Sequence, residues 1–280
     1  MNKNISKQEP FLTVFTPNYN RENLISETIE SILNQTYSNF EYIIIDDGST
    51  DNSWKIIQTY AKKDERIKPY RNEKNLGIVK TRNRGFKLSS KKSKYFAIID
   101  SDDIAILNRL ELQVDFLEQN PNYGLVGSSK YIINKDSRVI GFRDYPTSNK
   151  KIKKVITRYN PIAQSSVLLR KEVIKKIGKY DEKWGVCQDY DYWLRVGRDW
   201  KLKNLDIPLI KYRLGEDQVK FQNIAETIKF TCKIQEKAIR KYGYSDNIFN
   251  KIYRKLLFFS LIYPKFTYFL YRIRFSNFWL

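Results

Sequence analysis

The sequence predicts an α/β protein with a Rossmann-like, mostly parallel sheet and helices on both faces. Short apolar runs typical of buried strands alternate with segments whose apolar residues recur at helical spacing. Strands that alternate with helices form parallel pairs in a doubly wound sheet. Among 280 residues, 41% are hydrophobic, 29% charged and 15% aromatic. This composition excludes disordered, collagenous and coiled-coil chains, and the length predicts one large domain or two small ones.

The first half of the chain contains four of these strands. Each is an apolar, β-prone run that ends at turn-forming or acidic residues: 11–16, 40–45, 67–70 and 95–99. Helical periodicity predicts helices that begin near Asn23, Trp54 and Ile78. Polar residues at 49–52 can cap the second of these helices. The first half is therefore a regular series of strand–loop–helix units.

The second half is less regular. Its pattern predicts a helix over 110–118, strands over 123–133 and 165–169, and a short helix that ends at Gly178. A loop at 185–191 leads into a further helix, and a linker at 213–222 precedes a last helical segment. No internal repeat is present.

The charge and the missing residue types restrict the possible functions. There are 51 basic and 31 acidic residues, which give a formal net charge of +20. Such a charge favours a polyanion or an anionic membrane surface as a binding partner. The alternative is that the many lysines reflect an AT-rich coding sequence. Histidine is absent, which excludes Ser-His-Asp hydrolases, Cys-His proteases and His-ligated zinc sites. Carboxylates must then carry any acid–base chemistry and metal binding. Two cysteines, Cys187 and Cys232, cannot form a disulfide framework, and they favour a reducing compartment.

The two ends of the chain bear on its location. Residues 1–10 are polar and lack the apolar core of a signal peptide, and no run reaches the ~18–20 apolar residues that span a bilayer. Residues 251–280 combine six basic and eleven aromatic residues with no acidic one. This mixture is typical of a segment that lies on an anionic membrane; the alternative is a helix pair packed on the rest of the protein. We expect a cytoplasmic protein bound peripherally to the inner face of the cell membrane.

Acidic clusters follow two of the predicted strands. Asp46-Asp47 comes directly after 40–45, and Asp100-Ser101-Asp102-Asp103 comes directly after 95–99. In open parallel sheets, ligands bind in the crevice at the carboxyl ends of the strands. Carboxylates gathered there are costly at neutral pH unless a cation, sugar hydroxyls or the N–H groups of a base meet them.

Several motifs occur together in the order and spacing of one enzyme family. In chain order they are TPNYNR at 16–21, SILNQTY at 31–37, IDDGSTD at 45–51, NLG at 75–77, TRNRG at 81–85, DSDD at 100–103, GKYDE at 178–182 and QDYDYWLR at 188–195. They resemble family 2 glycosyltransferases over residues 11–218. The resemblance implies the GT-A fold, with a nucleotide-sugar-binding half at 1–104, an acceptor-binding and catalytic half at 105–220, and a C-terminal helical extension at 221–280.

The resemblance also assigns residues to the nucleotide-sugar donor. Pro17, Tyr19 and Asp47 match positions that cradle the base, where Tyr19 lies against the ring and Asp47 accepts from the imide N–H. Arg82 would face the base or the diphosphate; the alternative is an exposed cation on a helix.

The DSDD motif corresponds to the family's metal and ribose site. Asp100 would meet the ribose hydroxyls, with Ser101 beside it in the nucleotide-sugar site. Asp102 would hold Mn²⁺ or Mg²⁺, with Asp103 nearby. A divalent ion bridging the phosphates stabilises the negative charge that builds on the leaving diphosphate.

An inverting transferase needs a single carboxylate to deprotonate the acceptor hydroxyl. The family places this base as the Asp of a Glu-Asp pair at the start of an acceptor-side helix. Here the pair is Gln188-Asp189, so the resemblance makes Asp189 the base. Asp191 and Trp193 would shape the acceptor pocket; the alternative for Trp193 is core packing.

One position departs from the family pattern. Many members carry a histidine a few residues after a Tyr-Arg pair, where it contributes to the metal or diphosphate. This chain has Tyr212-Arg213 followed by Gly215 at the expected place. Asp217 or Gln218 is a possible substitute; otherwise the metal relies on Asp102, phosphates and water.

The predicted function is transfer of a hexosyl or N-acetylhexosaminyl group, with inversion, from a nucleotide-diphosphate sugar, first of all a UDP-sugar, to a hydroxyl of a glycan or lipid-linked acceptor. The composition indicates a microbe and hence surface polysaccharide or lipooligosaccharide synthesis. A nucleic-acid-binding protein is disfavoured because the acidic clusters repel phosphate, so no nucleic acid is expected as a partner. A nucleotide-dependent oxidoreductase is disfavoured because this chain has no GxGxxG motif after its first predicted strand. A non-catalytic sugar-binding or scaffold protein of the same fold remains the alternative.

Overall fold

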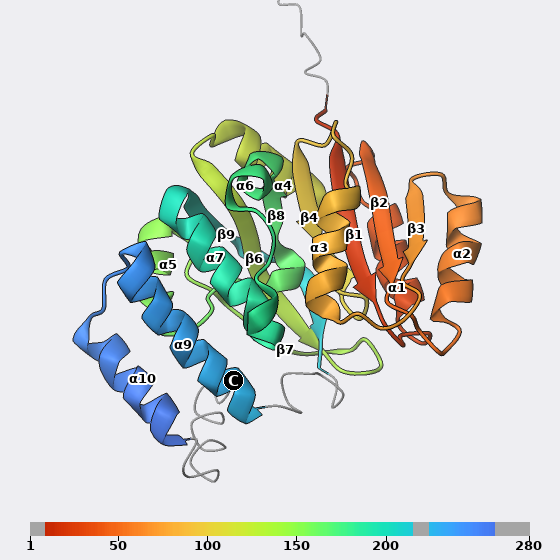
Figure 1. Cartoon of the computed structure of the whole chain (residues 1–280). Helices are drawn as coiled ribbons and strands as arrows, with labels where there is room; N and C mark the ends of the chain where they lie inside the picture. Colours follow the sequence, from red (N-terminus) through yellow and green to blue (C-terminus); the bar gives the residue numbers. More distant parts are fainter. Residues whose placement is uncertain (1–8, 215–223, 261–280) are drawn as a thin grey trace, which may run out of the picture.

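A computed structural model of the chain describes residues 9–214 and 224–260. Strands and helices alternate through its first half (Figure 1): β1 Leu12–Asn18, α1 Ile25–Leu33, β2 Phe40–Asp46, α2 Ser53–Lys63, β3 Ile67–Arg71, α3 Ile78–Leu88, β4 Tyr95–Ile98, β5 Ile104–Ala105 and α4 Arg109–Gln119. The second half contains β6 Tyr123–Ile133, β7 Val139–Arg143, α5 Asn149–Val155, the 3₁₀ turn η1 Gln164–Ser166, β8 Leu168–Arg170, α6 Lys171–Ile177, η2 Glu182–Cys187, α7 Gln188–Asp199, β9 Lys201–Arg213, α9 Ile224–Tyr242 and α10 Ile248–Ser260.

All the described strands belong to one nine-stranded sheet. Its order is β3-β2-β1-β4-β8-β6-β9-β5, with β7 paired to β6 outside this path. The strands β3, β2, β1 and β4 are parallel, whereas β8 is antiparallel to both β4 and β6. The strand order reverses between β1 and β4, and ligands of open α/β sheets bind at the carboxyl ends of the strands beside such a reversal.

The sheet is buried on both faces, which confirms the predicted fold class. Side chains alternate along each central strand: Tyr42 and Ile44 of β2 belong to a core with α1, α2 and α4, whereas Ile43 and Ile45 belong to a core with α3 and α7. Strands of this kind appear in the sequence as continuous apolar runs, and this is why the sequence predicts a strand at 40–45. The loops at the carboxyl edge are thereby held on a rigid support.

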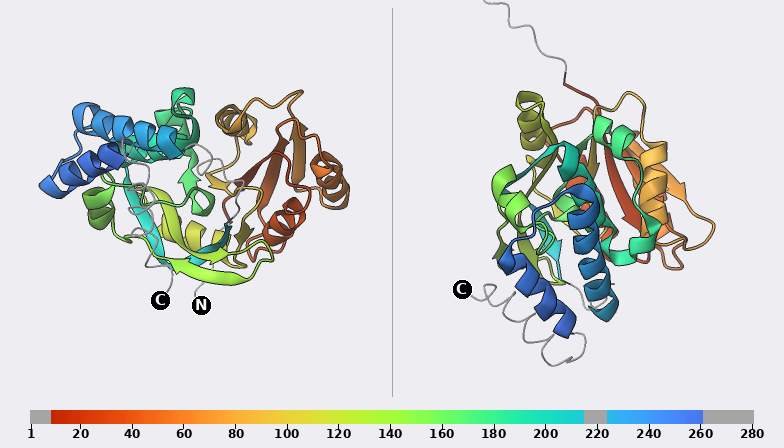
Figure 2. Two further views of the ribbon diagram at one scale, coloured as in Figure 1. Left: turned by 90° about the horizontal axis from the view of Figure 1, so that it is seen from below. Right: turned by 60° about the vertical axis from the view of Figure 1, so that its left-hand side comes forward.

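The C-terminal helices differ in how they are attached. Figure 2 shows α9 and α10 side by side, and α9 lies between α10 and α7. Helix α9 contributes Ile234 and Ala238 to the core that contains α7. Helix α10 is attached at its start, where Asn250 donates to Thr157 Oγ1 at 2.6 Å. No helix in the described ranges is long and apolar enough to cross a bilayer, and residues 261–280 of the aromatic, basic tail lie outside these ranges.

The structure corrects the prediction for the second half of the chain. The expected strand at 165–169 is a 3₁₀ turn followed by a short strand, β8. Strands β5, β7 and β9 were not predicted. The β9 sequence loses its apolar alternation because the pairing of β6 with β9 shifts register near Ser129. The period-2 signal is therefore interrupted within the strand.

Candidate active site

The end of β1 provides one wall of the site. Pro17 is buried and pairs with Ile45 of β2, whereas the neighbouring Tyr19 is 41% exposed. An exposed ring at the carboxyl edge of a parallel sheet is available for stacking. The structure therefore leaves Tyr19 accessible at the position predicted for the base.

Asp47, at the end of β2, is engaged by the protein. Its Oδ1 accepts from Asn72 Nδ2 at 2.6 Å and from Leu76 N at 2.9 Å, and its Oδ2 accepts from Gly77 N at 2.9 Å. A carboxylate offers about four acceptor positions. Asp47 therefore organises the loop before α3. Three of its acceptor positions are already occupied, so a base N–H would have to use the one that remains.

The loop after β2 requires the glycine of the IDDGSTD motif. Gly48 has a φ of +72°, and a Cβ atom there would lie 2.6 Å from the backbone carbonyl carbon of Lys74. Any other residue would clash and be strained. The motif thus lets the loop after β2 and the loop before α3 pass in close contact.

The acidic loop after β4 is paired with arginines. Arg82 of α3 donates from Nη2 to Asp100 Oδ1 at 2.6 Å, and Arg82 is only 5% exposed. The Nε of Arg21 lies 3.5 Å from Oδ2 of Asp102. Arg82 is therefore a buried partner of the acidic loop, and the alternative of an exposed helix cation is wrong.

The carboxylates of this loop crowd one another. Burial raises the pKa of Asp102, and the negative charge of Asp100 raises it further, whereas Arg21 lowers it. Burial, together with the charges of Asp102 and Asp100, raises the pKa of Asp103 to about 8. Such an arrangement favours a bound cation.

Arg213, the last residue of β9, holds the acidic loop in place. Its backbone N donates to Asp103 Oδ1 at 3.0 Å, and its Nε donates to the Asp102 carbonyl at 3.0 Å. Its Nη2 forms a 2.6 Å ion pair with Glu27 of α1. Arg213 thereby fixes the backbone that carries Asp102.

The start of α7 meets the acidic loop at Arg82. With the Gln188 amide oriented so that its oxygen faces Arg82, this oxygen accepts from Arg82 Nη1 and the amide nitrogen donates to the Gly185 carbonyl. The next residue, Asp189, accepts from Asn160 Nδ2 at 2.9 Å. Arg82 therefore connects Asp100 of the loop after β4 to Gln188 at the start of α7.

The environment of Asp189 suits a base. Burial raises the pKa of this carboxyl, an effect that the Arg82 charge and the Asn160 hydrogen bond oppose. A carboxylate with a raised pKa is a stronger proton acceptor than one in water. The structure thus brings Asp189 close to Arg82 and the donor-side carboxylates.

Two residues predicted to shape the acceptor pocket lie in the interior. Trp193 is fully buried and packs edge-on against Tyr192, so it is a core residue of α7. Asp191 is also fully buried, and its two oxygens pair with Arg195 Nε at 2.9 Å and Lys237 Nζ at 2.7 Å. Both expectations are corrected: on a helix, these positions face the core and α9 rather than the crevice.

Few of the described side chains could hold a metal ion. In the described ranges no three acidic or cysteine side chains are grouped closely enough to hold an ion. Asp102, whose side chain is 22% exposed, supplies the hard oxygen that Mn²⁺ or Mg²⁺ prefers. Ser101 is buried within the same loop. Asp217 and Gln218, the substitutes for the missing histidine, lie outside the described residues, so any further ligands would be phosphate oxygens, water or groups beyond these ranges.

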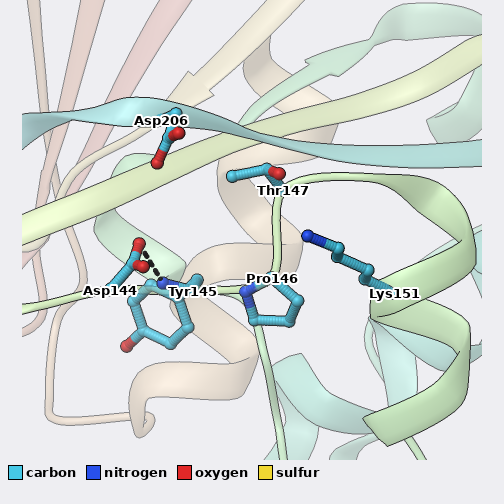
Figure 3. A pocket seen from close by; sticks show the side chains of 6 residues that line it. All are labelled: Asp144, Tyr145, Pro146, Thr147, Lys151 and Asp206. Carbon is cyan, nitrogen blue, oxygen red and sulfur yellow. Dashed lines mark hydrogen bonds between the residues drawn. The ribbon is translucent and has the colours of Figure 1, made fainter.

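A separate polar cavity of about 250 Å³ lies where β7 leads toward α5 (Figure 3). It is lined by Asp144, Tyr145, Pro146, Thr147, Lys151 and Asp206. The Asp144 carboxylate accepts from the hydroxyl of Ser129 at 2.7 Å and from the backbone N of Tyr145. None of the predicted site residues lines this cavity.

The sequence motifs assign no role to Arg21, Asn160 or Arg213. Arg21 is the last residue of the TPNYNR motif, and Arg213 is the second residue of the Tyr-Arg pair. Membership of these motifs is the sequence signal that points to a role for them. Asn160 lies in an irregular stretch between α5 and η1, where periodicity carries no information. Only the fold brings it to Asp189.

The fold is that of the GT-A class of glycosyltransferases. Among solved structures, the mannosyltransferase PcManGT of Pyrobaculum calidifontis, in complex with GDP-Man and Mn²⁺, is similar in fold. Its TM-score is 0.66 at 16% sequence identity, and the match covers 91% of this chain and 70% of that one.

The sequence comparisons identify the family. Residues 13–178 match the model of glycosyl transferase family 2. An uncharacterized glycosyltransferase of Methanocaldococcus jannaschii is 33% identical over 91% of this chain and 87% of the relative. UDP-Glc:alpha-D-GlcNAc-diphosphoundecaprenol beta-1,3-glucosyltransferase WfaP of Escherichia coli is 33% identical over 75% of this chain and 80% of the relative. The chain belongs to glycosyl transferase family 2, which confirms the resemblance of its motifs.

Proposed function

We propose that this glycosyltransferase transfers a hexosyl or N-acetylhexosaminyl group, with inversion, from a nucleotide-diphosphate sugar to a hydroxyl of a lipid-linked or glycan acceptor. The observation that carries the proposal is the position of Arg82, which contacts both Asp100 and Gln188. The residue after Gln188 is Asp189, a partly buried carboxylate that feels the charges of Arg82 and Asp100, and this supports its assignment as the base. One base is what a single in-line displacement needs.

The donor would bind at the carboxyl edge of β1, β2 and β4. Tyr19 and Asp47 would contact the base, Asp100 and Ser101 the ribose side, and Asp102 would hold Mn²⁺ or Mg²⁺. When bound, the ion stabilises the negative charge on the leaving diphosphate. A UDP-sugar is favoured because the named donor of the Escherichia coli relative is UDP-Glc.

Asp189 would remove the proton of the acceptor hydroxyl. The hydroxyl oxygen then forms a bond to the anomeric carbon as the bond from that carbon to the diphosphate breaks. The nucleoside diphosphate leaves with the electron pair. Attack on the face opposite the leaving group inverts the anomeric centre, which is why the base belongs to α7 and not to the donor loops.

A thermal-shift experiment tests donor binding. We expect UDP-sugars with Mn²⁺ to raise the melting temperature of the full chain, since a ligand that binds only the folded state stabilises it. UDP-sugars without Mn²⁺ should give a smaller rise. No shift with any UDP- or GDP-sugar in the presence of Mn²⁺ would contradict the proposed donor class. Binding without transfer to any hydroxyl acceptor would instead indicate the non-catalytic alternative.

We also propose that the protein works peripherally on an anionic membrane, in cell-surface polysaccharide or lipooligosaccharide synthesis. Helix α10 supports this, because four of its apolar side chains, Ile248, Phe249, Ile252 and Leu256, are 39–72% exposed. They recur at helical spacing, and Lys251 and Lys255 are exposed on the same helix. Exposed apolar residues on a basic helix are typical of interfacial binding. The named acceptor of the Escherichia coli relative is lipid-linked.

Sedimentation with vesicles tests this association. We expect the full chain to sediment with vesicles of equal parts phosphatidylcholine and phosphatidylglycerol, and the Phe249→Ser, Ile252→Ser double variant to bind more weakly. High salt should release only part of the protein, because salt screens the basic residues but not apolar burial. Complete release by salt would show that the apolar face of α10 makes no contact with lipid.

A further inference from the structure

The strand β7 exposes apolar side chains at an edge of the sheet. Val139 is 53% exposed, Ile140 50% and Phe142 46%, so three of its five residues are large, apolar and accessible. In the described ranges β7 pairs with β6 alone. Folded proteins ordinarily protect such edges with charge or cover. A concentration of exposed apolar residues here therefore indicates a contact surface.

Basic residues flank these apolar side chains. Lys135 and Arg138 are exposed in the turn that leads from β6 to β7, and Arg143 ends the strand; these three cations outnumber the two exposed acidic residues beside them, Asp136 and Asp144. The chain as a whole carries a formal net charge of +20. Apolar side chains with basic neighbours match the surface of an anionic bilayer, where the cations meet headgroups and the apolar groups enter the interface. A second copy of the chain would bring the same cations together, so a lipid surface is the favoured partner.

The turn of this hairpin lies next to the active site. Arg213 donates from Nη1 to the carbonyls of Asn134 and Lys135 at 3.0 and 2.9 Å, and from Nε to the carbonyl of Asp102. The hydroxyl of Ser137 donates to Glu27 at 2.7 Å. Figure 1 shows β7 at the lower edge of the molecule, toward which the arrowheads of β1 and β2 point. The hairpin thus belongs to the carboxyl edge that carries the candidate site.

We propose that the β6–β7 hairpin is a membrane-contact element that sets the carboxyl edge of the sheet against an anionic bilayer. Ile140 and Phe142 enter the lipid interface, and Lys135 and Arg138 meet the headgroups. This inference rests on the proposed peripheral membrane function and adds an orientation to it. A site held at the bilayer surface receives its acceptor hydroxyl from a lipid-linked molecule that diffuses in the membrane.

A local probe tests the hairpin independently of other lipid contacts. Cys187 and Cys232 are both buried, so a cysteine introduced by Ile140→Cys can be labelled selectively with an environment-sensitive fluorophore. We expect its emission to rise roughly twofold and shift to the blue on vesicles of equal parts phosphatidylcholine and phosphatidylglycerol, as the probe leaves water. The matched control is Lys92→Cys, which lies before β4 at the opposite edge of the sheet and should stay unchanged.

The two membrane proposals can fail separately. If the labelled protein sediments with vesicles but the Ile140→Cys probe does not respond, the hairpin inference is wrong while peripheral binding stands. If the probe responds without vesicles as protein concentration rises, the surface is an interface between copies, which also overturns the inference. Binding by the Ile140→Ser, Phe142→Ser double variant should weaken by about tenfold, and Leu107→Ser, at an exposed leucine outside the hairpin, should leave it unchanged.

Discussion

Replacing Asp189 with asparagine is expected to lower turnover by roughly 10²–10⁴-fold, the usual loss when a general base is removed. The affinity for the donor should change by less than about threefold, because the base would contact the acceptor and not the nucleotide. Asparagine keeps the shape of the side chain and can still meet Asn160 after an amide rotation, so the fold should be retained. Steady-state kinetics with a donor titration measure both quantities. Near-normal turnover, or an equal loss of donor binding, would remove Asp189 from this role.

The pH dependence provides an independent test of the base. Burial raises the pKa of Asp189, and the base acts when deprotonated. The rate should therefore fall as the pH falls through this raised pKa, at a pH above the ~3.9 of an ordinary aspartate. Asn160 donates to the charged carboxylate and stabilises it. The Asn160→Ala variant should consequently move the acidic limb of kcat/KM to higher pH, and an unmoved limb would contradict the assignment. The Gln188→Ala variant should lose less turnover than Asp189→Asn, since Gln188 would only orient the start of α7 through Arg82 and the Gly185 carbonyl.

Asp102→Asn is expected to abolish the Mn²⁺-dependent stabilisation by nucleoside diphosphate. The side chain is partly exposed and its ion pair with Arg21 is 3.5 Å long, so its loss should cost little folding free energy. A neutral amide is a much weaker ligand for a hard divalent ion than a carboxylate. Melting temperatures with UDP, with Mn²⁺ and with both give the measurement.

The matched control is Asp115→Asn, which removes a negative charge from an exposed position of α4. It should leave the Mn²⁺ effect intact. If the Asp102→Asn variant still shows the full Mn²⁺ effect, Asp102 does not hold the metal. If both variants lose it, the effect depends on overall charge rather than on a ligand at this position.

The predictable part of the fold is its parallel half. Strands such as 40–45 are buried on both faces, so nearly every residue is apolar and the run is visible without an alignment. The antiparallel half carries weaker signals. In β7, three apolar residues face solvent, and in β9 a register shift interrupts the alternation. Periodicity reports burial, so a strand whose burial is irregular escapes it.

The candidate site divides in a similar way. Asp100, Asp102 and Asp189 stand in motifs, and the structure brings Asp100 and the start of α7 to one arginine, Arg82. Helical position alone did not reveal that Asp191 and Trp193 face the interior, because α7 is covered on one side by the sheet and on another by α9. The partners of a helix face are set by tertiary packing, which a single sequence does not specify.

The two cores on opposite faces of the sheet also limit how the gene can change. Deleting one codon within β2 would exchange the faces of all later side chains in the strand, so that Ile43 and Ile45 would take the places of Tyr42 and Ile44. Length changes are therefore tolerated in the connecting loops and not in the strands. The loops at the carboxyl edge are therefore the parts of this half of the chain whose length is free to vary, while the central strands change by substitution alone.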